Sequence, residues 1–222
     1  MPAYYYYYFI LQFCPLIPLL AGAPNFKKLD PPLRFFLYYT TLTLLLTIVM
    51  TVMALRKANN LWLMNYAAPV ELGLLLWMFQ YWESEARLRI LIRSLIVPFL
   101  LIWSYEVILS GRFSQFTTYA RPIEGIILTF TACLTIYRVN KNLDEPITDK
   151  PSFWISAGIL LYFGGVIIIN LVSDSLLQKS DETLRQVLLL QVTLNFFSQI
   201  LFLIAFRSRI KRPPIEVGEA LV

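Results

Sequence analysis

The stretch Asn60–Phe79, NLWLMNYAAPVELGLLLWMF, is apolar enough for the interior of a membrane, yet it carries one glutamate near its centre. About 30 Å of hydrocarbon is crossed by about 20 helical residues, which this stretch supplies. Glu71 lies roughly 16 Å along the helix from Asn60, close to the midplane, where an ionised side chain is costly. The stretch therefore predicts a membrane helix that contributes to a buried polar site.

The composition of the whole chain agrees with a membrane protein. Of 222 residues, 58% are hydrophobic and only 15% are charged, which is too little charged surface for a soluble domain of this length. The sequence has no histidine, so imidazole-based zinc sites, haem ligands and Ser-His or Cys-His dyads are excluded. Cys14 and Cys133 lie in apolar runs and are expected to pack as free thiols. No cofactor and no metal site is predicted.

Seven apolar runs predict an all-α polytopic membrane protein, with residues 1–222 forming a single seven-helix transmembrane bundle. The runs lie near 3–23, 33–55, 61–82, 90–110, 117–137, 152–173 and 184–206. Short connections leave no room for a soluble domain, and 207–222 is expected to form a short basic cytoplasmic tail. The first run ends in a sequence similar to a signal-peptide cleavage site. Pro24 follows that site and no basic residue precedes the run, which favours a retained first helix.

The basic residues gather on one side of the predicted bundle. Thirteen of the 19 Lys and Arg residues fall on the side that holds the loops after runs 1, 3 and 5 together with the tail. The positive-inside rule then places the amino terminus outside and the carboxyl terminus in the cytoplasm of an inner (plasma) membrane. Topology therefore explains the net charge of +5, and no nucleic-acid partner is predicted.

With this orientation, most polar residues of the helices fall between the outer surface and the midplane. The candidate ligand-binding residues are Glu71, Arg121, Glu124, Asn65, Gln191 and Asn195. Ionisable groups in membrane helices face the bundle interior, where partners exist. Arg121 is the only base within reach of Glu71, Glu106 and Glu124, so at least one carboxylate should bind neutral groups, carry a proton or contact water. The pattern predicts a polar cavity in the outer half.

Several segments resemble those of a known family. They are NLWLMNYAAPVELGLLL with its buried Glu71, FTTYARPIEGIIL with Tyr119, Arg121 and Glu124, PSFWISAGILLYFGG, and the region around Asn195. In combination they resemble an uncharacterised seven-transmembrane-helix protein family common in Bacteroidota, over most of the chain from the second run onward. In that family a histidine often stands where this chain has Asn65. The resemblance implies no activity, but it implies a helix arrangement similar to the membrane sensor parts of some bacterial signalling proteins.

Seven helices with an outer amino terminus are also similar to microbial rhodopsins. Every lysine lies in a predicted loop or the tail, so the Schiff-base lysine of a retinal pigment is missing and retinal binding is excluded. The leading hypothesis is a receptor-like sensor in the lipid bilayer that binds a small or amphiphilic ligand and signals through a separate partner protein. An intramembrane lipid-processing enzyme with Glu71 and Glu124 as an acid–base pair is the second hypothesis. A structural or assembly subunit is the third.

Overall fold

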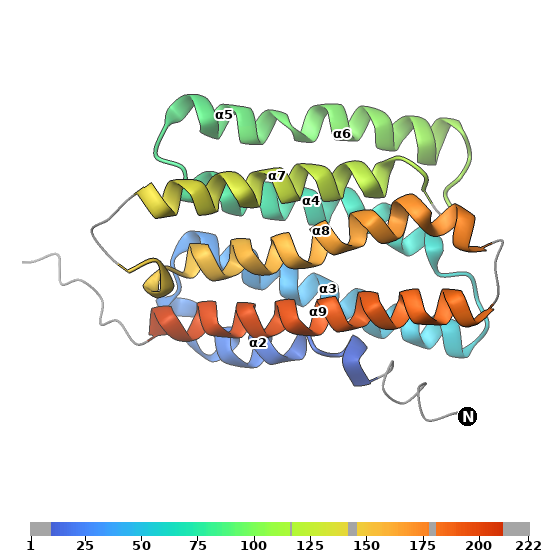
Figure 1. Ribbon diagram of the computed structural model, residues 1–222, viewed down its shortest axis with the longest axis horizontal. Helices are drawn as coiled ribbons and strands as arrows, with labels where there is room; N and C mark the ends of the chain where they lie inside the picture. Colours follow the sequence, from blue (N-terminus) through green and yellow to red (C-terminus); the bar gives the residue numbers. More distant parts are fainter. Residues whose placement is uncertain (1–9, 116, 142–145, 178–180, 211–222) are drawn as a thin grey trace, which may run out of the picture.

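The computed structural model describes residues 10–115, 117–141, 146–177 and 181–210, and over these ranges the protein contains only helices and their connections (Figure 1). Its elements are α2 (Leu16–Gly22), η1 (Ala23–Lys28), α3 (Pro31–Leu55), α4 (Leu61–Trp82), α5 (Ala86–Ser94), α6 (Ile96–Trp103), η2 (Ser104–Leu109), α7 (Ala120–Lys141), η3 (Ile147–Asp149), α8 (Pro151–Leu177) and α9 (Asp181–Ile210). The predicted all-α class is confirmed for the described residues.

Among the described residues, six helical segments are long and apolar enough to cross a membrane. They are Pro31–Leu55, Leu61–Trp82, Ala86–Leu109, Ala120–Lys141, Pro151–Ile169 and Leu189–Ser208. Each corresponds to one of the predicted runs from the second to the seventh. The chain thus has the helices of a multi-pass membrane protein. Residues 211–222 of the predicted tail lie outside the described part of the chain.

The first predicted run does not form one continuous helix. Residues 13–15 form a turn, and α2 begins only at Leu16. Residues 3–9 of this run lie outside the described residues. Pro15 and Pro18 lack the amide hydrogen that an uninterrupted helix would use. The six-residue 3₁₀ helix η1 follows directly after α2. With seven residues, α2 rises only about 10 Å, so it is too short to cross a bilayer alone.

The helices form a closed ring with one outer segment. α2, α3, α4, α7, α8 and α9 each pack against the next, and α9 packs back onto α2. The segment α5–α6–η2 lies outside this ring and packs against α4 and α7. Successive long helices run in opposite directions (Figure 1). We call the end that holds η1, the α4–α5 turn and η3 the basic end, and the other end the opposite end.

The buried apolar core occupies the half of the bundle next to the basic end. In α3 the buried residues run from Pro32 to Thr40, and no later residue of this fully described helix is buried. α8 contributes Ile155 and Ile159 near its start, and α9 contributes Phe206 near its finish. Since antiparallel neighbours place these positions at the same level, these buried side chains all lie between the basic end and the middle of the bundle.

Candidate functional site

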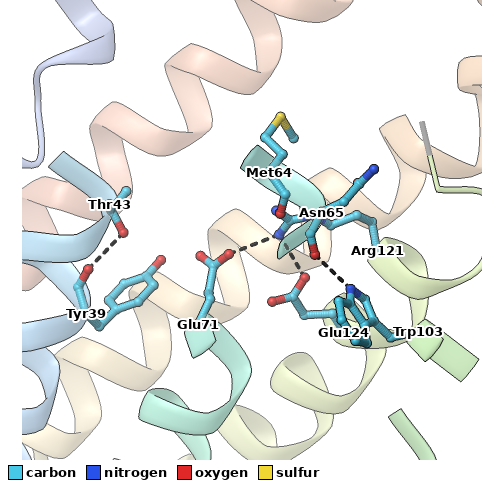
Figure 2. A network of polar contacts seen from close by, with 8 residues as sticks. All are labelled: Tyr39, Thr43, Met64, Asn65, Glu71, Trp103, Arg121 and Glu124. Atoms are coloured by element: carbon cyan, nitrogen blue, oxygen red, sulfur yellow. Dashed lines mark hydrogen bonds and ion pairs between the residues drawn. The ribbon is translucent and has the colours of Figure 1, made fainter. Parts of the chain in front are cut away.

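An ionic cluster of three side chains joins α4 to α7 at the level where the buried face of α3 ends (Figure 2). Arg121 Nη1 donates to Glu71 Oε2 at 3.0 Å and to Glu124 Oε2 at 2.8 Å. The side chain of Glu124 is 1% exposed, whereas those of Glu71 and Arg121 are 14% and 19% exposed. The structure therefore brings together the three charged residues that the sequence singled out, and Glu71 points toward α7.

Pro69, which lies inside α4, explains part of the hydrogen bonding around the cluster. Proline at this position leaves the carbonyl of Asn65, four residues earlier, without its helical donor. The indole Nε1 of Trp103 donates to that oxygen at 2.8 Å, so a side chain replaces the missing helical donor. Arg121 Nη2 donates to the neighbouring carbonyl of Met64 at 2.6 Å. The guanidinium is thus held by the backbone of α4 as well as by the two carboxylates.

Glu106 positions the start of α7. The wide π-helical turn η2 buries this carboxylate, which is 2% exposed. Its oxygens accept hydrogen bonds from the backbone amides of Thr118, Tyr119 and Ala120, with the last at 2.8 Å. A carboxylate at a helix amino terminus satisfies amides that have no helical acceptor and interacts favourably with the helix dipole. The sequence predicted that at least one of the three carboxylates within reach of Arg121 binds neutral groups, carries a proton or contacts water. Glu106 binds neutral groups, because its oxygens cap α7.

Asn65 does not contact the ionic cluster through its side chain. Its amide nitrogen donates to the carbonyls of Phe113 at 3.0 Å and Gln115 at 2.8 Å, in the connection between η2 and α7. Asn65 therefore holds the connection between η2 and α7, rather than forming part of the cluster. Sequence analysis could not assign these acceptors, because carbonyls in an irregular loop leave no pattern in the sequence.

Two tyrosines lie near the carboxylates of the cluster, and a glutamine contacts one of the two tyrosines. Tyr39 of α3 and Tyr162 of α8 both lie within electrostatic reach of Glu71 and Glu124. Figure 2 shows the hydroxyl of Tyr39 turned toward Glu71. Tyr162 has a side-chain hydrogen bond with Gln191 of α9, which links the predicted residue Gln191 to the cluster through one intermediate. No pattern in the sequence distinguishes these two tyrosines from the other members of a set of thirteen.

The remaining predicted residue, Asn195, is paired within its own helix. Gln199 Nε2 donates to Asn195 Oδ1 at 2.9 Å, an i, i+4 bond along α9. Gln199 is buried, and Asn195 is half-buried. The expected polar stripe on α9 therefore exists, but the described contacts of Asn195 end on that helix and do not reach Arg121 or either carboxylate.

A stripe of threonines on α3 lines the opposite half, and the sequence analysis did not recognise it. Thr40, Thr43, Thr47 and Thr51 follow each other at helical spacing and continue the face on which Phe36 is buried. The first three donate to the backbone carbonyls four residues earlier, as in Thr47 Oγ1 to Thr43 O at 2.9 Å. The inward face of α3 thus changes from apolar to polar at the level of the cluster.

Two polar atoms of the cluster are buried without a hydrogen-bond partner among the described residues. They are Arg121 Nε and Glu124 Oε1. Across the same residues, no group of three or more Cys, Asp or Glu side chains is arranged to hold a metal ion. The cluster is therefore an ion-pair site with unused bonding capacity rather than a closed network.

These features define the class of protein: an α-helical, multi-pass membrane protein with an ionic cluster inside the bundle. Comparison of the chain with protein-family models, with curated proteins and with solved structures gives no match.

Proposed function

We propose that this protein is a receptor-like membrane sensor whose ligand-binding site is the polar half of the bundle, with the Glu71–Arg121–Glu124 cluster as its floor. The observation that carries the proposal is the position of the cluster: the buried face of α3 ends at its level, and Glu71 and Arg121 keep 14% and 19% of their side-chain surface accessible. A charged pair that is accessible inside a membrane bundle provides directional contacts for a small polar or amphiphilic ligand.

In this proposal the opposite end faces outside. The excess of Lys and Arg at the basic end puts that end in the cytoplasm of an inner membrane. The amino-terminal segment before α3 would supply the seventh crossing as a broken helix, in keeping with the Bacteroidota seven-helix family that the sequence resembles. In this proposal, the signal passes to a separate partner protein.

The geometry favours binding over acid–base catalysis. An acid–base pair that activates water needs two carboxylates with water or substrate between them. Here one guanidinium nitrogen stands between the carboxylates, at 3.0 Å and 2.8 Å. A purely structural role would favour a fully paired polar network, yet Glu124 Oε1 lacks a hydrogen-bond partner among the described residues. The enzyme and assembly-subunit hypotheses are therefore second to the sensor.

Thiol labelling tests whether the polar half is a water-filled site. In a variant without Cys14 and Cys133, Thr47→Cys places a thiol on the threonine stripe, and Leu45→Cys places one on the 56%-exposed outer face of the same helix. A membrane-impermeant maleimide added outside is expected to label Thr47→Cys and to leave Leu45→Cys unlabelled, because a thiol facing lipid does not ionise. Failure to label Thr47→Cys, or labelling of Thr47→Cys only from the cytoplasmic side, would overturn the proposal.

Ligand binding is then tested with the labelling reaction as the readout. A set of small amphiphiles is screened for compounds that raise the melting temperature of the wild-type protein in nanodiscs. A true ligand is expected to slow the labelling of Thr47→Cys and to lose its thermal effect in Glu71→Gln. It should keep that effect in Glu85→Gln, which changes an exposed glutamate at the basic end. A compound that acts equally on both glutamine variants does not bind at the cluster.

A further inference from the structure

We infer that Glu124 carries a dissociable proton, so that the cluster is a proton-binding site in the middle of the bundle. The first step is the charge count. Two carboxylates, those of Glu71 and Glu124, share the single positive charge of Arg121. With both carboxylates ionised, the cluster would hold one uncompensated negative charge away from bulk water, which is costly.

The described residues around the cluster supply no second cation. Arg121 and Glu71 are the charged groups that act on Glu124. α3 presents the phenol of Tyr39 and α8 presents the phenol of Tyr162, and both act electrostatically on the same carboxylates. On α9 the nearest polar group is the uncharged amide of Gln191, which binds Tyr162. Among the described residues, the missing positive charge must therefore come from outside the protein, and a proton is the smallest species that can supply it.

Burial decides which carboxylate takes the proton. Glu71 is 14% exposed and can be hydrated, whereas Glu124 is 1% exposed and its Oε1 is buried without a hydrogen-bond partner among the described residues. Figure 2 shows only one oxygen of Glu124 bonded to Arg121. Protonation of Oε1 turns an unsatisfied, charged acceptor into a neutral hydroxyl. Adding a proton to this oxygen does not require a cavity beside Glu124. The other oxygen keeps its 2.8 Å bond to Arg121.

A proton at this position has a structural consequence. With Glu124 neutral, Arg121 pairs fully with Glu71 and joins α7 to α4. When the proton leaves, Glu124 competes with Glu71 for the same Nη1 atom, and the link between the two helices weakens. Proton binding would then set the geometry of the accessible carboxylate Glu71. The inference that Glu124 binds a proton does not depend on whether an organic ligand binds in the polar half of the bundle.

Infrared difference spectroscopy of the reconstituted protein during a pH titration tests the inference. The wild type is expected to show the carbonyl band of a protonated carboxylic acid at neutral pH, and the band should disappear as the pH rises. Glu124→Gln should lose this band, and the control Glu85→Gln should keep it. In Glu71→Gln one negative charge is gone, so Glu124 should ionise more readily and its band should appear only at lower pH.

Two outcomes would overturn the inference: a wild type without such a band, or a band that survives in Glu124→Gln. Folding is checked by a second measurement, because glutamine resembles the neutral carboxyl group in shape and charge. Glu124→Gln is expected to unfold within a few degrees of the wild type at neutral pH. Should it fail to fold, Glu124→Asp keeps a carboxyl group and is expected to shift the frequency of the band; an unshifted band places the proton elsewhere.

Discussion

Arg121 Nη1 lies 3.0 Å from Glu71 Oε2 although the two residues are 50 positions apart in the sequence. The same guanidinium donates through Nη2 to the backbone of α4 at Met64, so one side chain of α7 holds α4 in two places. Side-chain and backbone contacts of this kind fix the relative position of two membrane helices, since lipid competes for neither. The predictions below examine what positions Arg121 and what limits the bundle around it.

The cap formed by Glu106 should stabilise α7 and hold Arg121 in place. Glu106→Ala is expected to lower the free energy of unfolding by about 1–2 kcal/mol, the usual range for a lost helix cap. Glu106→Gln keeps an oxygen acceptor and should lose less. Titration with a denaturing detergent, followed by circular dichroism, measures both variants. Equal stability of the alanine variant and the wild type would contradict the capping role.

The bond from Trp103 to the Asn65 carbonyl should compensate for the kink at Pro69. Trp103→Phe keeps a ring that can contact Tyr66 but removes the indole donor. The carbonyl oxygen is then left without its donor, and the expected loss is about 1–3 kcal/mol of unfolding free energy. Adding Pro69→Ala restores an amide four residues after Asn65 and should recover part of the loss. No recovery in the double variant would show that the two features are independent.

Close packing of α8 on α9 should require glycine at residue 158. A Cβ atom at this position would collide with the ring of Phe202, which is only 3% exposed and has little room to move. Gly158→Ala is expected to destabilise the protein by about 1–3 kcal/mol. Gly73→Ala is the matched control, because nothing lies within 4 Å of the added atom. The control should be neutral or gain up to about 1 kcal/mol from helix propensity. Similar effects of the two changes would contradict this packing.

The sequence was a good guide to the spans and a poor guide to their continuity. Run length and hydropathy report which residues suit hydrocarbon, and the run over 61–82 corresponds to α4, Leu61–Trp82. They do not report where a backbone breaks: Pro15 interrupts the first run, yet Pro69 is accommodated inside α4. The difference depends on neighbours that can satisfy the freed carbonyl, and Trp103 does so for Asn65.

At the site, charge was easier to predict than hydrogen bonding. An unpaired charge inside a membrane bundle is energetically costly, so the pairing of Arg121 with Glu71 and Glu124 could be predicted from this cost alone. Asn65 and Asn195 had many possible partners, and the structure gives them loop carbonyls and Gln199. The polar face of α3 could have been found from the helical spacing of Thr40, Thr43 and Thr47, had threonine been treated as a lining residue.

The most direct test of the central claim, that Glu71 and Arg121 form one buried site between α4 and α7, is a double-mutant cycle on the free energy of unfolding. Arg121→Gln alone leaves two carboxylates without a base and should cost about 3–5 kcal/mol. Adding Glu71→Gln removes one of those carboxylates, so the double variant should be more stable than the sum of the single effects, with a coupling of about 1–3 kcal/mol. The same cycle on Arg138 and Glu85, an exposed pair, should be nearly additive. Additive effects at Glu71 and Arg121 would contradict the claim.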